Sequence, residues 1–115
     1  MGLLARLTNG RMGARGSSVD DGLVHLRAWA TSHEGVEGFV EPRTTVTETT
    51  LLLVDKDGAW TRRRISGPSE ARRFARSLAM PVYDVQLVGY PQRMRDHDAR
   101  QRILRKRASR ADLEP

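Results

Sequence analysis

Residues 46–65 contain the feature that most restricts what this chain can fold into. Threonine, leucine and valine dominate the first half, which ends in Leu51 to Val54 and suits a pleated, half-buried strand. The turn residues Asp55 to Gly58 follow, and glycine readily takes the positive φ that closes a short hairpin loop. A second strand over residues 59–65 carries three consecutive arginines. The segment therefore predicts a β-hairpin that the rest of the chain covers.

Length and composition indicate one small domain without covalent cross-links. The chain has 115 residues, of which 38% are hydrophobic, and it contains no cysteine. Disulfides, thiolate-bound zinc and a thiol nucleophile are therefore excluded. No apolar run approaches the roughly 20 residues that span a bilayer, and Met1 to Leu7 is too short for a secretory signal. These observations predict a soluble cytoplasmic protein, and no motif for a cofactor is present.

The positive charge is concentrated at the two ends of the chain. The net charge is +6, and residues 31–91 carry eight basic and eight acidic groups. Residues 1–30 carry four arginines and two aspartates, and residues 92–115 carry eight basic and four acidic groups. Arginine supplies 18 of the 20 basic residues, and it suits bidentate phosphate contacts. Two explanations of this bias are open: an anionic partner, or the arginine-rich codon usage of a GC-rich genome.

The chain before the hairpin predicts an arm, a helix and a strand. Residues 1–18 are rich in glycine and arginine and are expected to form a flexible arm. Ser18 resembles a helix cap, and apolar residues then recur at helical spacing as far as Gly35. Residues 24–30 also alternate as a strand would, but the acidic cap and the glycine favour a helix. Residues 36–41 are expected to form a strand that ends before Pro42.

The chain after the hairpin predicts a second helix, a strand and a basic helix. Pro68 and Glu70 occupy positions that favour the start of a helix, which is expected to end before Pro81. Residues 82–88 are mostly apolar and indicate a central or half-covered strand. Residues 92–107 contain i,i+4 pairs of aspartate and arginine but few apolar residues, which predicts a projecting basic helix that frays toward the end.

Together these elements predict an α+β fold with a small mixed sheet of about four strands. Their order is α-β-β-β-α-β, followed by the basic C-terminal helix. The first three strands are expected to form an antiparallel meander, with the strand at 82–88 parallel to the arginine strand. The predicted domain covers residues 19–91, between the arm at 1–18 and the tail at 92–115.

This succession of elements resembles the core of restriction-endonuclease-like nucleases. Such enzymes carry an acidic residue early on the second strand and an acid-x-lysine triplet on the third, which together hold magnesium. Here the corresponding positions are Thr49, Thr50 and residues 62–64, which are all arginine. The resemblance therefore implies no nuclease activity and only hints at nucleic-acid binding.

Two other segments are similar to small proteins of high-GC actinobacteria. They are residues 61–64 and 82–95, and the similarity extends over about residues 20–100. The family has no established activity, so it supports the integrity of the domain and implies no mechanism.

No pattern of catalytic or metal-binding residues is present. The three histidines lie on separate elements without ligand spacing, and residues 96–98 of a helix point in different directions. A nucleophile elbow, a phosphate loop and a dinucleotide motif are absent. The sequence predicts a protein without catalytic activity or a bound metal.

The charge pattern leads to a hypothesis of nucleic-acid binding. The partner would be RNA or DNA, with the ribosome as one candidate, and contacts to the backbone would dominate because aromatic content is only 5%. The expected contact residues are Arg62, Arg64, Tyr90, Arg93, Arg95, Arg102, Arg105 and Arg107. An alternative is a protein-interaction module whose basic helix or sheet edge docks on an acidic partner. A third interpretation places the arginines on an anionic membrane surface.

Overall fold

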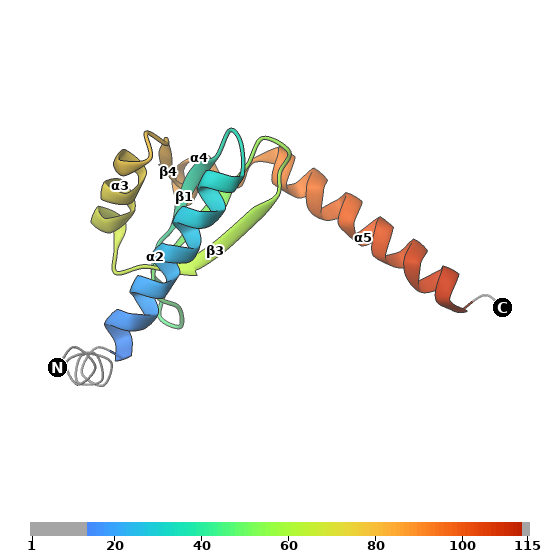
Figure 1. The fold of residues 1–115 in the computed structure, drawn as a ribbon, viewed down its shortest axis with the longest axis horizontal. Helices are drawn as coiled ribbons and strands as arrows, with labels where there is room; N and C mark the ends of the chain where they lie inside the picture. The colour runs from blue at the N-terminus through green and yellow to red at the C-terminus, as the bar shows by residue number, and fades with distance from the viewer. Residues whose placement is uncertain (1–13, 114–115) are drawn as a thin grey trace.

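The computed structural model describes residues 14–113, with side chains from residue 19 onward. Within this range the chain forms four helices and one four-stranded mixed sheet (Figure 1). The elements are α2 (Ala14–Ser32), β1 (Glu37–Glu41), β2 (Thr50–Val54), β3 (Trp60–Arg64), α3 (Pro68–Ser77), β4 (Val82–Asp84), α4 (Val85–Val88) and α5 (Gln92–Leu113). The predicted α+β class, the order of its elements and the C-terminal helix are confirmed.

The sheet has the strand order β3-β2-β1-β4. The first three strands form the expected antiparallel meander, and β4 runs parallel to β1. The strand β3 therefore points in the same direction as β4 but lies at the opposite edge of the sheet. Its arginines are placed as expected of an edge strand, where charge discourages pairing with another chain.

The inner strand β2 has apolar side chains buried on both faces of the sheet. On one face Leu51 and Leu53 pack with Leu26 of α2 and Phe74 of α3. The other face holds a smaller cluster, whose members are Phe39, Leu52, Val54 and Met94. Helices α2 and α3 therefore cover one face, and the start of α5 covers part of the other.

The strand predicted at residues 82–88 is wrong in its length, and of the two positions expected for it the central one is wrong. Strand β4 ends at Asp84, whose carboxylate accepts a 2.8 Å hydrogen bond from the backbone N–H of Gln86 and caps the short helix α4. Such a cap turns the chain out of the sheet. The strand is an edge strand, and Leu87 in α4 is 84% exposed.

The helix expected to start at Ser18 begins at Ala14. Alanine and arginine at positions 14 and 15 favour helix, so the helix extends further toward the N-terminus than the capping pattern indicated. The helical interpretation of residues 24–30 is confirmed, and the alternating strand is excluded. The first 13 residues of the expected arm lie outside the described range.

Helix α5 starts against the sheet and then projects away from it (Figure 1). The radius of gyration is 17.7 Å, compared with about 13 Å for a compact chain of this length. The molecule therefore consists of a small body with a long helical extension.

Candidate functional site

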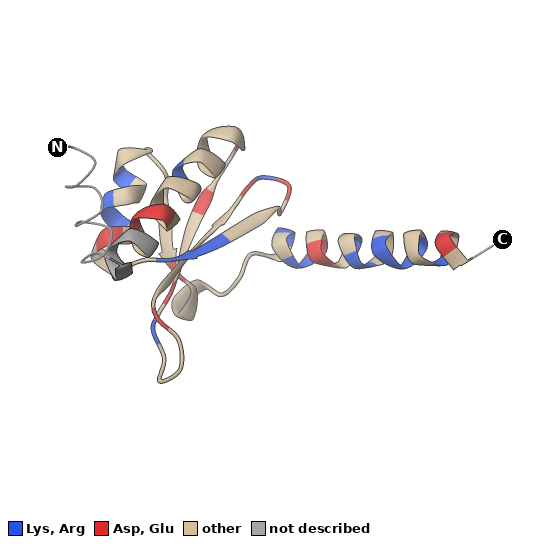
Figure 2. Ribbon diagram, turned by 60° about the horizontal axis from the view of Figure 1, so that its bottom comes forward, with Lys and Arg blue, Asp and Glu red and all other residues tan. Residues whose placement is uncertain are grey.

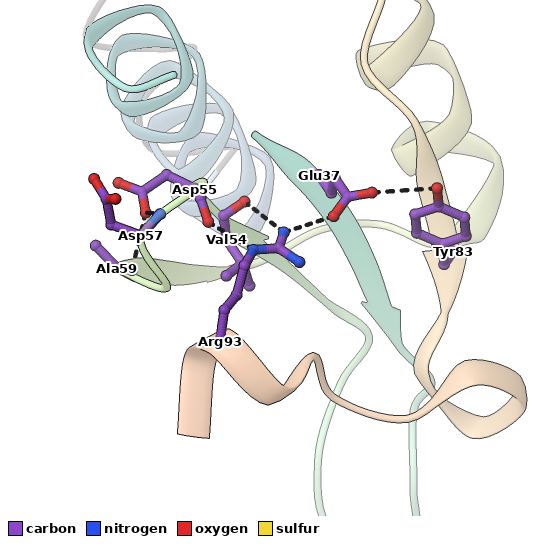
Figure 3. A network of polar contacts seen from close by, with 7 residues as sticks. All are labelled: Glu37, Val54, Asp55, Asp57, Ala59, Tyr83 and Arg93. Atoms are coloured by element: carbon purple, nitrogen blue, oxygen red, sulfur yellow. Dashed lines mark hydrogen bonds and ion pairs between the residues drawn. The ribbon is translucent and has the colours of Figure 1, made fainter. Parts of the chain in front are cut away.

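The start of α5 is held on the sheet by Arg93 (Figure 3). The guanidinium donates a 2.8 Å hydrogen bond from Nε to the backbone oxygen of Asp55, and Nη2 lies 2.6 Å from Oε1 of Glu37. The other oxygen of this carboxylate accepts a 3.2 Å hydrogen bond from the hydroxyl of Tyr83 on β4. Since charge-assisted hydrogen bonds are the stronger kind, this network holds the first turn of α5 against β1, β2 and the hairpin turn.

The hairpin turn packs directly against the backbone of α5. The carboxylate of Asp55 accepts hydrogen bonds from the N–H groups of Asp57 and Ala59, at 2.9 and 3.0 Å. Gly58 has a φ of +93°, as the turn prediction required. A Cβ at this position would lie only 2.0 Å from the backbone oxygen of Arg93. The turn and the helix therefore meet at a point where only glycine fits.

Two further contacts guide α5 as it leaves the body. The indole Nε1 of Trp60 donates a 2.8 Å hydrogen bond to Oδ1 of Asp98, and Nη2 of Arg100 donates a 3.2 Å hydrogen bond to the backbone oxygen of Asp57. Every residue from 101 to 113 is exposed. Residues 102–113 correspond to about 18 Å of helix, at 1.5 Å per residue.

The projecting part of α5 carries a dense set of cations (Figure 2). They are Arg102, Arg105, Lys106, Arg107 and Arg110. No acidic residue occurs between Asp98 and Asp112, and within the described residues none of the five cations forms an ion pair or hydrogen bond with another side chain. The spacing of Arg95, Arg102, Lys106 and Arg110 places these four on one face of the helix.

The expected contact residues divide into three groups. Three belong to polar networks of the body: Arg62 and Tyr90 contact Glu41, and Arg93 contacts Glu37. Arg64 is exposed on β3 and lines a surface hollow of about 510 Å³ together with other charged residues. The remaining four are exposed on α5, and they are Arg95, Arg102, Arg105 and Arg107.

The carboxylate of Glu41 is the centre of the second polar network. Nε and Nη2 of Arg62 lie 2.6 and 2.8 Å from its two oxygens, which makes the contact bidentate. The hydroxyl of Thr50 donates a 2.8 Å hydrogen bond to the same carboxylate, and the hydroxyl of Tyr90 donates another. Only 15% of the Glu41 side chain is exposed. The network joins three strands and the loop before α5.

Two opposing influences act on the pKa of Glu41. Burial is the largest single one and raises the pKa, because it disfavours the charged carboxylate. The hydrogen bonds from Arg62, Tyr90 and Thr50 favour the charged form, and together they hold the pKa below its usual value of 4.5. The contact with this carboxylate also raises the pKa of Tyr90.

Replacing Glu41 with glutamine is expected to destabilise the fold in a pH-dependent manner. A pKa that is lower in the folded state contributes stability above about pH 4.5, and this contribution is lost as the pH falls through the folded pKa. The variant should unfold with a free energy about 1 to 3 kcal/mol lower than wild type at pH 7. The difference should shrink between pH 5 and pH 3, measured by urea unfolding.

Glu34→Gln is the control for this prediction. Glu34 forms a 2.9 Å ion pair with Lys56, but both side chains are largely exposed, at 81% and 58%. Solvent screens such a pair, so its loss should have a much smaller effect. A Glu41→Gln difference that stayed constant from pH 7 to pH 3 would contradict the role assigned to the carboxylate.

Trp60 and two further cations of α5 were not among the residues expected from the sequence. Trp60 lies at the start of β3, beside the hairpin turn, and its indole contacts Asp98 of α5. An aromatic residue next to a turn on an arginine-rich strand could have indicated a binding residue. Its hydrogen-bond partner Asp98 is 38 residues away in sequence, so the contact with α5 could not be predicted. Lys106 and Arg110 could have been found from their i,i+4 spacing.

The described residues show neither a metal site nor a membrane span. Among them no group of three or more His, Asp or Glu side chains could hold a metal ion. No helix in the described range combines the length and apolar character needed to cross a bilayer. Comparison with protein-family models, curated proteins and solved structures found no match for this chain.

Proposed function

We propose that this chain is a non-enzymatic nucleic-acid-binding protein whose principal contact surface is the projecting part of α5. The observation that carries the proposal is the set of five exposed cations on residues 102–110, which the structure holds away from the body. None of the five forms an ion pair with a carboxylate of the described residues. An RNA or DNA backbone supplies the matching negative charge.

The composition of the projecting helix favours a polyanion over an apolar partner. Its large apolar residues are Ile103, Leu104 and Leu113, and they are 49%, 53% and 83% exposed. At 100° per residue these three point in different directions, so they form no apolar stripe. A membrane-surface helix and a helix that docks in an apolar groove both need such a stripe. A helix that is polar on all sides instead fits a partner that it contacts through charge.

The anchoring of α5 supports the same proposal. The contacts of Arg93, Met94 and Asp98 fix the direction in which the helix leaves the sheet. A helix held in place loses little conformational freedom when it binds, so more of the electrostatic attraction contributes to affinity. The proposed contacts between α5 and the nucleic acid are to phosphates, and binding should therefore tolerate different nucleotide sequences.

The proposal predicts a steep dependence of affinity on salt. Each phosphate contact contributes about 0.9 to the slope of log K against log salt for duplex DNA, and about 0.7 for a single strand. With the five cations engaged, the slope should lie between about −3 and −5. Fluorescence anisotropy of a labelled oligonucleotide, titrated between low and moderate ionic strength, measures it.

Polyglutamate separates nucleic acid from an acidic protein as the partner. At equal charge concentration it should displace the oligonucleotide much less effectively than unlabelled nucleic acid does. Duplex DNA carries one negative charge per about 1.7 Å and releases condensed counterions on binding, whereas extended polyglutamate carries one per about 3.5 Å. Equal displacement would favour the acidic protein partner. A binding constant that did not change with salt would refute the proposal.

A further inference from the structure

Trp60 occupies the junction between the body and the projecting helix. It is the first residue of β3, directly after the hairpin turn, and is 36% exposed. The other tryptophan, Trp29, packs against the core cluster on the opposite face of the sheet and stacks on His33 at 3.8 Å. Only one of the two indoles therefore lies near the cations of α5.

The ring of Trp60 is held in place by two neighbours. Its Nε1 donates a hydrogen bond of 2.8 Å to Asp98, and the guanidinium carbon of Arg62 lies 5.1 Å from the ring centroid. Arg62 is itself held by the bidentate contact with Glu41. An aromatic ring that is fixed in advance binds a flat partner at a low entropic cost.

Two surface hollows meet at this ring, and cations line both. The larger has a volume of about 450 Å³ and includes Arg102 and Arg105 in its wall. The smaller has a volume of about 330 Å³ and includes Arg95 and Tyr90. The helix face that packs on the body at Asp98 continues into the larger hollow, since positions 98, 101, 102 and 105 share one side of a helix. The indole is thus flanked by cations on the same helix.

We propose that Trp60 stacks on an unpaired base of single-stranded nucleic acid whose phosphates lie on Arg95, Arg102 and Arg105. This inference rests on the proposed function and specifies its substrate class. Bases inside a duplex are stacked and paired, so their faces are not accessible to an aromatic side chain. Single-strand binding combines a charged path for the backbone with an aromatic ring for the bases, and both are present here.

The carboxylate of Asp98 is consistent with a base at this position. It lines both hollows next to the indole and carries a negative charge that repels phosphate. The group that fits beside the ring is therefore the uncharged base, with the phosphates on the arginines that flank Asp98 along α5. Stacking depends little on base identity, so the preference is for single strands and not for a sequence.

The test compares a labelled single strand of about 16 nucleotides, the upper site size for such proteins, with the duplex of the same sequence. Wild type should bind the single strand about tenfold or more tightly. Trp60→Ala should weaken single-strand binding by roughly 5- to 100-fold, the loss expected for one stacked base. It should affect duplex binding and the salt slope of both much less, because the phosphate contacts remain and Arg93 and Met94 still anchor α5.

Two variants separate stacking from a structural role of the indole. Trp60→Phe keeps an aromatic ring but lacks the donor to Asp98, and Asp98→Ala removes the acceptor while the indole remains. Both should keep most of the single-strand preference if stacking is responsible. A comparable loss in Trp60→Phe, Asp98→Ala and Trp60→Ala would assign the effect to the docking of α5 and overturn the inference.

The remaining outcomes distinguish this inference from the function on which it rests. Equal, salt-dependent binding of single strand and duplex, with no effect of Trp60→Ala, would refute base stacking and leave nucleic-acid binding through α5 intact. Failure to bind either oligonucleotide at low salt would refute the proposed function itself. In wild type, binding should also quench tryptophan fluorescence, and in Trp60→Phe the remaining Trp29 should not respond.

Discussion

A variant with Arg102, Arg105 and Arg107 replaced by glutamine is expected to bind nucleic acid roughly 100-fold more weakly than wild type at about 0.1 M salt. The three side chains are exposed and lie on the part of α5 that projects from the body. Removing three phosphate contacts should also make the slope of log K against log salt less negative by about 2 to 3. Glutamine and arginine have similar helix propensities, so the helix should persist.

The matched control replaces the three arginines of α3, Arg72, Arg73 and Arg76, by glutamine. These side chains are also exposed on a helix, and the change in net charge is the same. They lie on the body, on the face of the sheet opposite to the start of α5. The control should retain most of the affinity and the wild-type salt slope. Equal losses in the two variants would show that overall charge, and not α5, determines binding.

Gly58→Ala is expected to lower the free energy of unfolding by about 3 kcal/mol and to displace α5 from the hairpin turn. The φ of +93° is strained for any side chain. The added methyl would also lie 2.0 Å from the backbone oxygen of Arg93 and 2.9 Å from the Cβ of His97, so the turn or the helix must move. Thermal unfolding reports the stability, and near-UV circular dichroism reports the surroundings of Trp60.

Gly67→Ala is the control for this substitution. Apart from the neighbouring residues in the chain, no atom would lie within 4 Å of a methyl group at Gly67, and its φ of 166° is extended backbone. Its position before α3 makes alanine slightly unfavourable as a cap, with an expected cost below about 1 kcal/mol. If Gly58→Ala were as stable as Gly67→Ala and left the near-UV signal unchanged, the close packing of the turn against α5 would be wrong.

Two of the arginines expected to contact nucleic acid are instead paired with carboxylates of the body. Arg62 and Arg93 are paired with Glu41 and Glu37, both on β1. The first pair joins β3 to β1 and the second joins the start of α5 to β1, so these two acidic residues of β1 serve the fold. Among the described residues the cations from Arg102 to Arg110 form no ion pair, and their charge is available to a partner.

Local sequence patterns predicted most of the elements because local rules determine them. The apolar run of β2, the turn glycine at position 58 and Pro68 at the start of α3 all act within a few residues. The predicted length of β4 was wrong because a local helix cap outweighs the apolar strand pattern. The cap that Asp84 forms with Gln86 ended β4 after three residues, although the apolar pattern continued to Val88.

The sequence by itself determined the hairpin, the α+β class and the excess of positive charge in the last helix, because periodicity, turn residues and net charge are properties of neighbouring residues. Only the tertiary structure decided which arginines are neutralised and which are exposed. It also placed Trp60 beside Asp98, 38 residues further along the chain. The physical reason is that ion pairs and ring contacts depend on distances in space, which the packing of α5 on the hairpin sets.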